Sequence, residues 1–321
     1  MLIAAALYLA VAGVSLAQDV PSPTPSPAAR QSLDDAWWTG PLLAPGAGTL
    51  PRGHVLVEPY FYDVIHYGNY DRHGAVTAAE HSQTFGSLTY IIYGLADRFN
   101  IGIIPTVNYT RATHGRSSSS LKFGDWTVQA QYRMTQYHPG SWIPTTSISI
   151  QQTFPTARYD KLGPHPNDGF GSGVYSTMLS LYTQTYFWMP NGRVLRTRLN
   201  VSQQFSTGTS VSGVSVYGTE AGFIGRAKPG NVFTIDAAAE YSATRNWVLA
   251  TDLVYTYDAN TRLTAASGTT DLGDAHSVAF APAIEYNWSS DVGLIAGIRL
   301  FPAGRNTSAS IMPVFAINYV H

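Results

Sequence analysis

The chain of 321 residues contains no cysteine and has few charged side chains. The lack of cysteine excludes disulfide bonds, thiolate nucleophiles and cysteine-ligated metal sites. Asp, Glu, Lys and Arg make up 12% of the residues, against about 25% in a typical soluble domain, so the charges are too few to cover a large water-facing surface. The net charge is −1 and no basic run is present, which argues against nucleic acid as a partner.

Long hydrophobic runs are also missing. Beyond the N-terminus no apolar run approaches the roughly 18 residues that a membrane-spanning helix needs. The mean hydropathy is −0.04, a value that arises when apolar and polar residues alternate and average each other out. Low charge together with neutral hydropathy favours a β-barrel of a membrane over a helical membrane protein.

Residues 125–134 show the alternation without a fault. One side carries Trp126, Val128, Ala130, Tyr132 and Met134, and the other carries Asp125, Thr127, Gln129, Gln131 and Arg133. Successive side chains of a strand point to opposite faces of the sheet, so this period of two indicates a strand between an apolar and an aqueous phase.

The same pattern recurs along most of the chain, with turn residues between the segments. The expected strands cover residues 54–64, 83–94, 99–110, 123–134, 145–154, 174–188, 193–205, 231–242, 246–257, 276–286, 292–301 and 308–320. Long connections rich in Gly, Ser and Asn alternate with short turns such as Pro190-Asn191-Gly192. The pattern predicts an all-β fold: a transmembrane antiparallel up-and-down β-barrel of about 12 strands over residues 54–321, with both termini in the periplasm. Four prolines fall inside expected strands, where bulges near the strand ends would accommodate them.

The N-terminal 53 residues lack this alternation and divide into three parts. An apolar stretch up to Leu16, followed by Ala17, predicts a cleaved signal peptide over residues 1–17 and hence export. Residues 18–30 form a linker rich in Pro and Ser. Residues 31–53 are irregular and carry the adjacent Trp37 and Trp38, which are expected either in a plug folded into the barrel or in a periplasmic arm.

Polar and charged residues on the face opposite the apolar one are expected to line or gate the lumen. Charges of both signs there would either set up a field across an open pore or fill the bore with salt bridges, and both alternatives use the same residues. The candidates are Gln129, Gln131, Arg133, Arg196, Arg198, Asp236, Glu240, Asp252, Glu285 and Arg299.

Patterns for catalysis and for metal binding are weak. No Gly-x-Ser-x-Gly sequence is present, and the spacing of His66, His73 and His81 matches no standard zinc pattern. Asp236 and Glu240 would lie about 13 Å apart along one strand, too far for a glycosidase pair. We therefore predict no catalytic residue, no metal and no cofactor.

Several short landmarks together resemble an outer-membrane family known as the putative MetA-pathway of phenol degradation proteins. They are Trp38-Thr-Gly-Pro-Leu42, Gly53-His54 with Glu58-Pro-Tyr60, Gly94-Leu-Ala-Asp-Arg-Phe99 with Ile101-Gly102, Gly124-Asp125, Phe154-Pro-Thr156 and Gly171-Ser-Gly173. The terminal His321 departs from the aromatic residue on which such barrels commonly end.

The resemblance implies a channel of the Gram-negative bacterial outer membrane for passive uptake of small, hydrophobic or aromatic compounds, and no enzyme. Expected partners are outer-membrane lipid, small-molecule solutes and the barrel-assembly machinery. Two alternatives stay open: a non-transporting barrel that acts as an anchor or surface-interaction protein, and an outer-membrane hydrolase.

Overall fold

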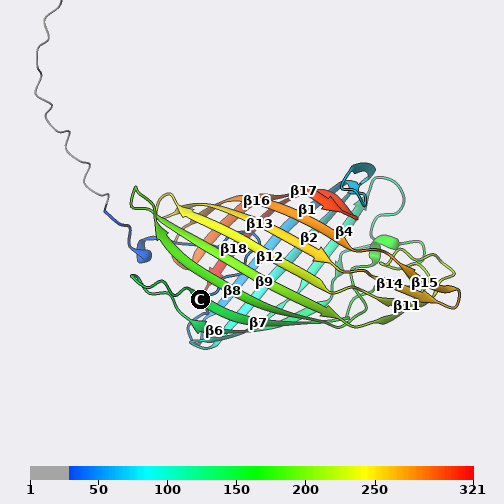
Figure 1. The fold of residues 1–321 in the computed structure, drawn as a ribbon, viewed down its shortest axis with the longest axis horizontal. Helices are drawn as coiled ribbons and strands as arrows, with labels where there is room; N and C mark the ends of the chain where they lie inside the picture. The colour runs from blue at the N-terminus through cyan, green and yellow to red at the C-terminus, as the bar shows by residue number, and fades with distance from the viewer. Residues whose placement is uncertain (1–28) are drawn as a thin grey trace, which may run out of the picture.

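The computed structural model describes residues 29–321, so the predicted signal peptide and nearly all of the predicted linker lie outside the described residues. The described chain forms a closed antiparallel β-barrel of 12 strands, which confirms the predicted fold class (Figure 1). Its helices are two short 3-10 turns, η1 (Leu33–Asp35) and η2 (Pro166–Asp168). No helix in residues 29–321 has the length and apolar character needed to cross a membrane.

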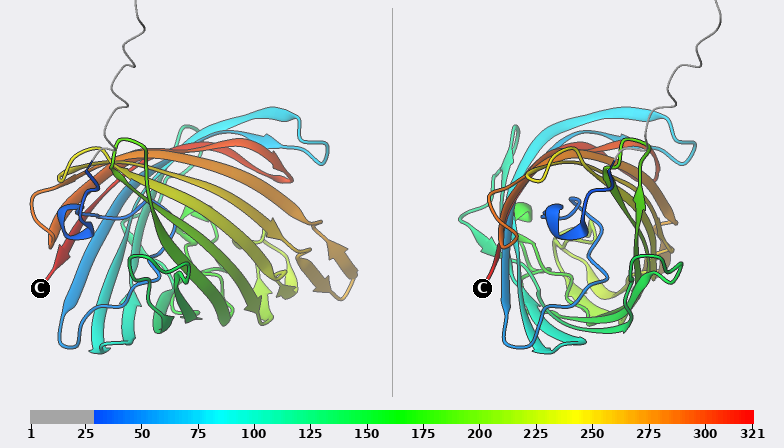
Figure 2. Two further views of the ribbon diagram at one scale, coloured as in Figure 1. Left: turned by 60° about the vertical axis from the view of Figure 1, so that its left-hand side comes forward. Right: turned by 90° about the vertical axis from the view of Figure 1, so that its left-hand side faces the viewer.

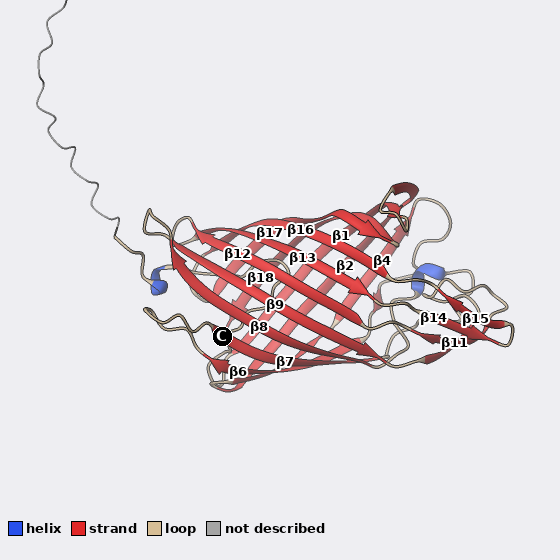
Figure 3. Cartoon of the chain, viewed as in Figure 1, coloured by secondary structure: helices blue, strands red, loops and turns tan. Residues whose placement is uncertain are grey.

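The wall strands follow one another in chain order, and two of them are broken into two pieces. The continuous ones are β1 (Val55–Tyr70), β2 (Val76–Ala96), β7 (Thr145–Phe154), β8 (Ser176–Trp188), β9 (Val194–Ser206), β12 (Val232–Ser242), β13 (Trp247–Asp258), β16 (Ala275–Asn287), β17 (Val292–Arg305) and β18 (Thr307–Val320). The broken ones consist of β3 (Phe99–Ile104) with β4 (Thr106–Ala112), and of β5 (Lys122–Phe123) with β6 (Trp126–Thr135). The strands dominate the cartoon in Figure 3.

Pairing of the first and last strands closes the barrel. β1 pairs with β18 through Leu56 and Val320, and on its other side with β2 through Leu56 and Ile92. Figure 2 shows the resulting ring along its axis. One end of the barrel carries the short turns, which we call the short-turn end, and the other carries the longer connections, which we call the long-loop end.

Side chains sort between the two faces of the wall as the alternation predicts. Ile101, Leu249 and Leu253 point outward with exposed fractions of 39%, 53% and 54%. Inward-pointing Gln131, Glu240 and Asp252 are buried. An apolar outer surface around a polar interior is the distribution expected for a barrel in a lipid bilayer.

The strand prolines are accommodated by one-sided gaps in the ladder rather than by the bulges expected near strand ends. Pro59 stays in register with β2, but pairing of β1 with β18 is interrupted beside it. Pro282 keeps its register with β13 and Pro313 with β17, and each lies in a gap on its other side. Pro105 separates β3 from β4. Because proline has no N–H to donate, each loses ladder bonds toward only one neighbour.

The first hairpin is longer than the sequence indicated, so the expected loop over residues 65–82 is wrong. β1 and β2 continue past an irregularity at His66–Gly68 and meet in a tight turn at Asp71. The Asp71 carboxylate accepts hydrogen bonds from the backbone N–H groups of Ala75 and His73, which lower the pKa of Asp71. The alternation fails at the irregularity, which is why the extension was missed.

Two expected long loops contain a second, smaller sheet. Its strands are β10 (Thr209–Ser212), β11 (Ile224–Lys228), β14 (Arg262–Ala265) and β15 (Gly268–Asp271), in that order. The sheet projects from the long-loop end (Figure 1). Its strands of four and five residues are too short for a period of two to stand out in the sequence.

Residues 31–53, which we call the lumenal segment, lie inside the barrel near the short-turn end (Figure 2). Apart from η1 the segment has no regular secondary structure. Its backbone groups must therefore find partners on the wall.

Candidate functional site in the barrel lumen

The lumenal segment is fixed to the short-turn end at both of its own ends. The Gln31 N–H donates to the carbonyl of Gly192 at 2.9 Å, and the Gly53 N–H donates to the carbonyl of Gly94 at 2.8 Å. Gly192 belongs to the turn between β8 and β9, whereas Gly94 precedes the turn between β2 and β3. These turns belong to well-separated strands of the ring, so the segment crosses the bore between them.

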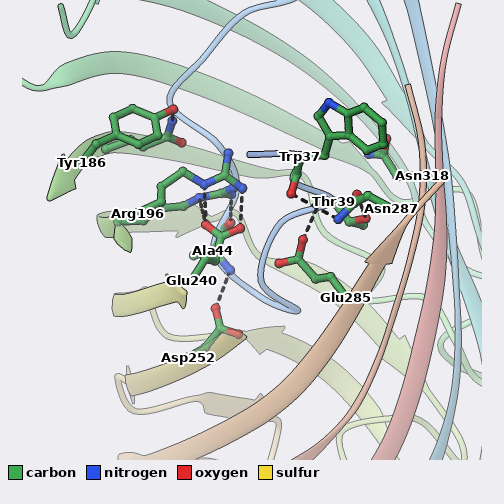
Figure 4. Close-up of polar contacts among 12 residues, drawn as sticks. Trp37, Thr39, Ala44, Tyr186, Arg196, Glu240, Asp252, Glu285, Asn287 and Asn318 are labelled. Atoms are coloured by element: carbon green, nitrogen blue, oxygen red, sulfur yellow. Dashed lines mark hydrogen bonds and ion pairs between the residues drawn. The ribbon is translucent and has the colours of Figure 1, made fainter. Parts of the chain in front are cut away.

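A cluster of buried charges stands beside the middle of the segment (Figure 4). Arg196 on β9 binds Glu240 on β12 through both its Nε, at 2.7 Å, and its Nη2. The Nε of Arg198 lies 3.1 Å from the same carboxylate. Glu240 is fully buried and both guanidinium groups are more than nine-tenths buried, so the carboxylate compensates two cations in a site shielded from water.

Two further carboxylates receive backbone N–H groups of the lumenal segment. Glu285 accepts from Thr39 at 2.7 Å, and Asp252 accepts from Ala44 at 3.0 Å. Arg198 completes the contact by donating from Nη1 to the carbonyl of Ala44 at 2.6 Å. Charge-assisted hydrogen bonds of this kind are stronger than neutral ones. The wall therefore binds the backbone of the segment firmly at Thr39 and at Ala44.

Uncharged polar side chains hold the rest of the segment. Asn200 donates to the carbonyl of Pro45 at 2.9 Å, and Gln131 donates to the carbonyls of Gly46 and Gly48 at 3.0 and 3.1 Å. The Ser147 hydroxyl donates to the carbonyl of Ala47. Almost every contact in this stretch addresses the backbone of the segment rather than its side chains.

The paired tryptophans of the segment lie against arginines of the wall. The Trp38 ring lies 4.4 Å from the guanidinium carbon of Arg196, and the Trp37 ring lies 4.2 Å from that of Arg245. The carbonyl of Trp37 also accepts from Asn287 at 3.2 Å. Cation–π contacts therefore hold Trp38 against the charge cluster and Trp37 against Arg245, near the short-turn end.

Gly40 is required where the segment passes Arg198. Its φ of +120° lies in a region that residues with a side chain rarely adopt. A Cβ built at this position would lie 3.3 Å from Nη2 of Arg198. Any larger residue would therefore both strain the backbone and crowd the guanidinium group.

An apolar contact anchors the other side of the segment. Leu42 packs in a buried cluster with inward-facing residues of β13, β16, β17 and β18, namely Ala250, Ala281, Ile295, Val314 and Ala316. The lumen is thus two-sided, with an apolar wall of small side chains and, toward β6–β9, a wall of amides and hydroxyls.

The remaining predicted lumen residues form no hydrogen bond with residues 31–53. Gln129 accepts a bond from Gln151 at 3.3 Å, and Arg133 lies at the rim, donating to the carbonyl of Asp97 at 3.1 Å. Asp236 is buried, with one carboxylate oxygen that has no hydrogen-bond partner among the described residues. Arg299 places its guanidinium 4.7 Å from the ring of Phe301.

Several contact residues were missed from the sequence. The segment is also held by Asn100, Ser147 and Asn287, but the candidates for the lumen were charged residues and glutamines. Their signal was present, because each lies in the inward phase of its strand. No group of three or more metal-ligating side chains comes together in residues 29–321.

Comparisons with known proteins agree with this architecture. Residues 61–311 match the family described as "Putative MetA-pathway of phenol degradation". Among solved structures, the COG4313 outer membrane channel from Pseudomonas putida F1 superimposes with a TM-score of 0.68 at 13% identity, over 87% of this chain and 100% of that one. No curated protein matches the sequence.

Two other structures cover a similar share of the chain but superimpose less closely. The beta domain of the Bordetella autotransporter BrkA gives a TM-score of 0.45 at 11% identity, over 83% of this chain and 99% of that one. The toluene transporter TodX of Pseudomonas putida gives 0.39 at 10% identity, over 84% and 90%. Only the first of the three similarities is high enough to support the shared fold.

Proposed function

The chain belongs to the family described as "Putative MetA-pathway of phenol degradation", and from this premise we propose that it is a channel of the bacterial outer membrane for passive uptake of small, hydrophobic or aromatic compounds. In this proposal the short-turn end faces the periplasm and the lumenal segment is the gate. The membrane lipid and the small solutes are its partners, and no catalytic role is proposed.

One observation carries the proposal: a polypeptide segment without secondary structure crosses the bore, and the wall holds it through its backbone. A barrel that served only as an anchor would gain more stability from ordinary packed side chains. Hydrogen bonds to the backbone of the segment can be exchanged for hydrogen bonds to water when the segment moves. The arrangement therefore suits a segment that can leave the lumen.

The lumen next to the segment supports the proposed class of compound. Small apolar side chains line one side of the bore and polar ones the other. A hydrophobic molecule could follow the apolar side while the segment is displaced. The charged cluster borders this apolar side, because Glu240 on β12 pairs with Ala250 on β13, and Glu240 compensates the charges of Arg196 and Arg198.

Removal of the segment tests the gate. The mature chain, starting at Gln18, and a variant starting at Pro51 are reconstituted in planar bilayers, and their conductances are compared. Because the segment crosses the bore, the shorter chain should conduct more. Equal conductance in well-folded samples would show that residues 18–50 do not restrict the pore.

A reversible cross-link tests the same gate without deleting residues. An ideal Cβ at Gly293 on β17 would lie 2.1 Å from the hydroxyl oxygen of Thr39, so side chains at these two positions would be in direct contact after a small local shift. The natural chain has no cysteine, so Thr39→Cys with Gly293→Cys would form the only disulfide. Uptake of a small aromatic compound into liposomes should fall on oxidation and return on reduction, while each single-cysteine variant should not respond.

A surface-interaction role is the second candidate, and the four-stranded sheet at the long-loop end favours it. Ile224 at the start of β11 is 77% exposed, and all residues of the edge strand β15 are exposed. Shortening the connection over residues 206–230 discriminates between the two candidates. Uptake should survive this change, whereas a binding role of the loops should be lost.

Assembly into the membrane is proposed to use the barrel-assembly machinery. β18 ends with outward-facing Phe315, Ile317 and Tyr319, and the ring of the terminal His321 stacks on Tyr319 at 6.3 Å. The stacked pair provides aromatic surface at the end of β18. His321→Phe should therefore leave assembly unchanged or improve it.

A further inference from the structure

A cavity of about 250 Å³ lies between the lumenal segment and the barrel wall. Its lining combines residues 39–50 of the segment with inward-facing residues of β1, β2, β6 and β8. Its size can be judged against an apolar cavity of about 150 Å³, which is enough to hold benzene. The cavity therefore has room for one substituted aromatic ring.

The segment supplies the apolar side of this cavity. Leu42, Leu43 and Leu50 all face it, together with the proline rings at positions 41 and 45. These side chains offer a surface on which a ring can pack without losing hydrogen bonds.

The wall supplies the polar side, with Glu58 and Tyr60 on β1 and Tyr90 on β2. The rings of Tyr60 and Tyr90 meet edge to face at 5.9 Å, which fixes their orientation. Glu58 is 9% exposed, and it accepts a long hydrogen bond of 3.4 Å from Asn318. No cation among residues 29–321 forms an ion pair with Glu58, and no described residue hydrogen-bonds the Tyr90 hydroxyl, so both groups have free capacity toward the cavity.

We propose that this cavity binds a neutral compound with a single aromatic ring and a hydroxyl group. The ring packs against the leucines of the lumenal segment, and its hydroxyl donates to the Glu58 carboxyl group and accepts from the Tyr90 hydroxyl. The inference deepens the proposed function, on which it rests for the direction of transport, since it names the substrate class and a place where the substrate stops on its way.

The charges around the cavity disfavour an anionic ligand. Arg198 is the one cation that lines the cavity among the described residues, and it is already engaged with the carbonyl of Ala44 and with Glu240. An aromatic carboxylate would meet the acidic Glu58 without a free cation to compensate it. Phenol should therefore bind better than benzoate.

Binding to the purified full-length protein in lipid nanodiscs tests the proposal. Phenol, anisole, toluene and benzoate are titrated by calorimetry. Anisole keeps the ring and the oxygen of phenol but cannot donate a hydrogen bond, so phenol should bind at least about fivefold more tightly than anisole, toluene or benzoate. Equal affinity for phenol and toluene would overturn the proposal.

Two variants locate the site. Glu58→Gln and Tyr90→Phe should each weaken phenol binding by about five- to tenfold and leave toluene binding unchanged, because only the hydroxyl contacts are lost. Retained toluene binding also shows that the variant has folded. The matched control is Tyr255→Phe, which changes a tyrosine on the outer face. Phenol binding that is unaffected by both cavity variants would contradict the assignment.

The binding measurement tests the cavity and the conductance measurement tests the gate, so each proposal can be contradicted independently of the other. If deletion of residues 18–50 raises conductance but the full-length protein does not distinguish phenol from toluene, the channel stands and the site is wrong. If the full-length protein binds phenol selectively and the deletion leaves conductance unchanged, the site stands and the gate is wrong.

Discussion

Arg198 donates from Nη1 to the carbonyl oxygen of Ala44 at 2.6 Å, across 154 positions of sequence. The same arginine lies beside Glu240, which also holds Arg196. One guanidinium group therefore joins the charge cluster of the wall to the backbone of the lumenal segment. Its loss should loosen the segment more than the loss of any uncharged contact.

We predict that Arg198→Ala raises single-channel conductance severalfold relative to the natural protein. The change removes a charge-assisted bond worth about 1.5–3 kcal/mol and the support of the segment at Ala44. The matched control is Arg262→Ala. The Arg262 side chain is 64% exposed and lies on β14, in the four-stranded sheet outside the barrel wall. Conductance of the two variants is compared in planar bilayers, and equal values would show that Arg198 does not hold the segment.

Gly40→Ala should displace the lumenal segment without touching the wall. The positive φ costs a residue with a Cβ about 1–2 kcal/mol, and the new methyl group crowds Arg198. Gly48→Ala is the control, because its Cβ would meet nothing within 4 Å. Protease cleavage after Trp37 and Trp38 in detergent should speed up in the first variant alone. If both variants are cleaved at the rate of the natural chain, the constraint at Gly40 is unimportant.

Glu240→Gln should destabilise the barrel by about 3 kcal/mol or more, since it leaves two buried guanidinium groups without their counter-charge. The measurement is the temperature at which the folded band disappears in a heat-modifiability gel. Asp291→Asn, in an exposed turn, is the control for loss of an acidic group. A melting temperature equal to that of the control would mean that another group compensates the arginines.

Acid should release the connection between two loops at the long-loop end. Asp168 accepts from the backbone N–H and the hydroxyl of Ser119, both at 2.7 Å, and Lys122 lies 3.4 Å away. Burial acts to raise the pKa of Asp168, but the bonds from Ser119 and Lys122 outweigh it and lower the pKa below the usual 3.8. A lowered pKa stabilises the folded state at pH values above 3.8 and loses this contribution as the pH falls through the lower value.

Pepsin, which is active in acid, can report this release by cleaving near Leu121 and Phe123, two of the most exposed apolar residues. Cleavage of the natural chain should begin only below pH 3.8, whereas Asp168→Asn should be cut at higher pH as well. Asp271→Asn, at an exposed ion pair with Arg262, should behave like the natural chain. Identical pH profiles for all three would remove Asp168 from this role.

Much of the fold could be predicted from the sequence because each wall strand lies between two phases. The stretch from Trp126 to Met134 alternates since one face meets lipid and the other the lumen, and the same cause acts on every wall strand. The prediction of strands failed for segments that do not lie between lipid and lumen. The outer part of the β1–β2 hairpin and the four-stranded sheet stand clear of the barrel, so no bilayer imposes a period on them.

The sequence predicted the residues of the barrel wall that form the candidate site, but not the groups of the lumenal segment that they bind. Arg196, Glu240 and Glu285 stand out as charges in the inward phase of their strands, and the structure places them together at the lumenal segment. Their partners in residues 39–48 are backbone N–H and carbonyl groups, which every residue possesses and no sequence pattern marks. The sequence therefore left the plug and the periplasmic arm as equal alternatives.

Because the wall grips the main chain, the lumenal segment behaves as a peptide ligand that is tethered to its own receptor. A tether that joins it to β1 keeps its local concentration in the millimolar range, so that even a weak intrinsic affinity holds it bound most of the time. The strength of the proposed gate is then set by this local concentration as much as by the hydrogen bonds. A longer connection between Gly53 and β1 would weaken the gate while leaving every contact in place.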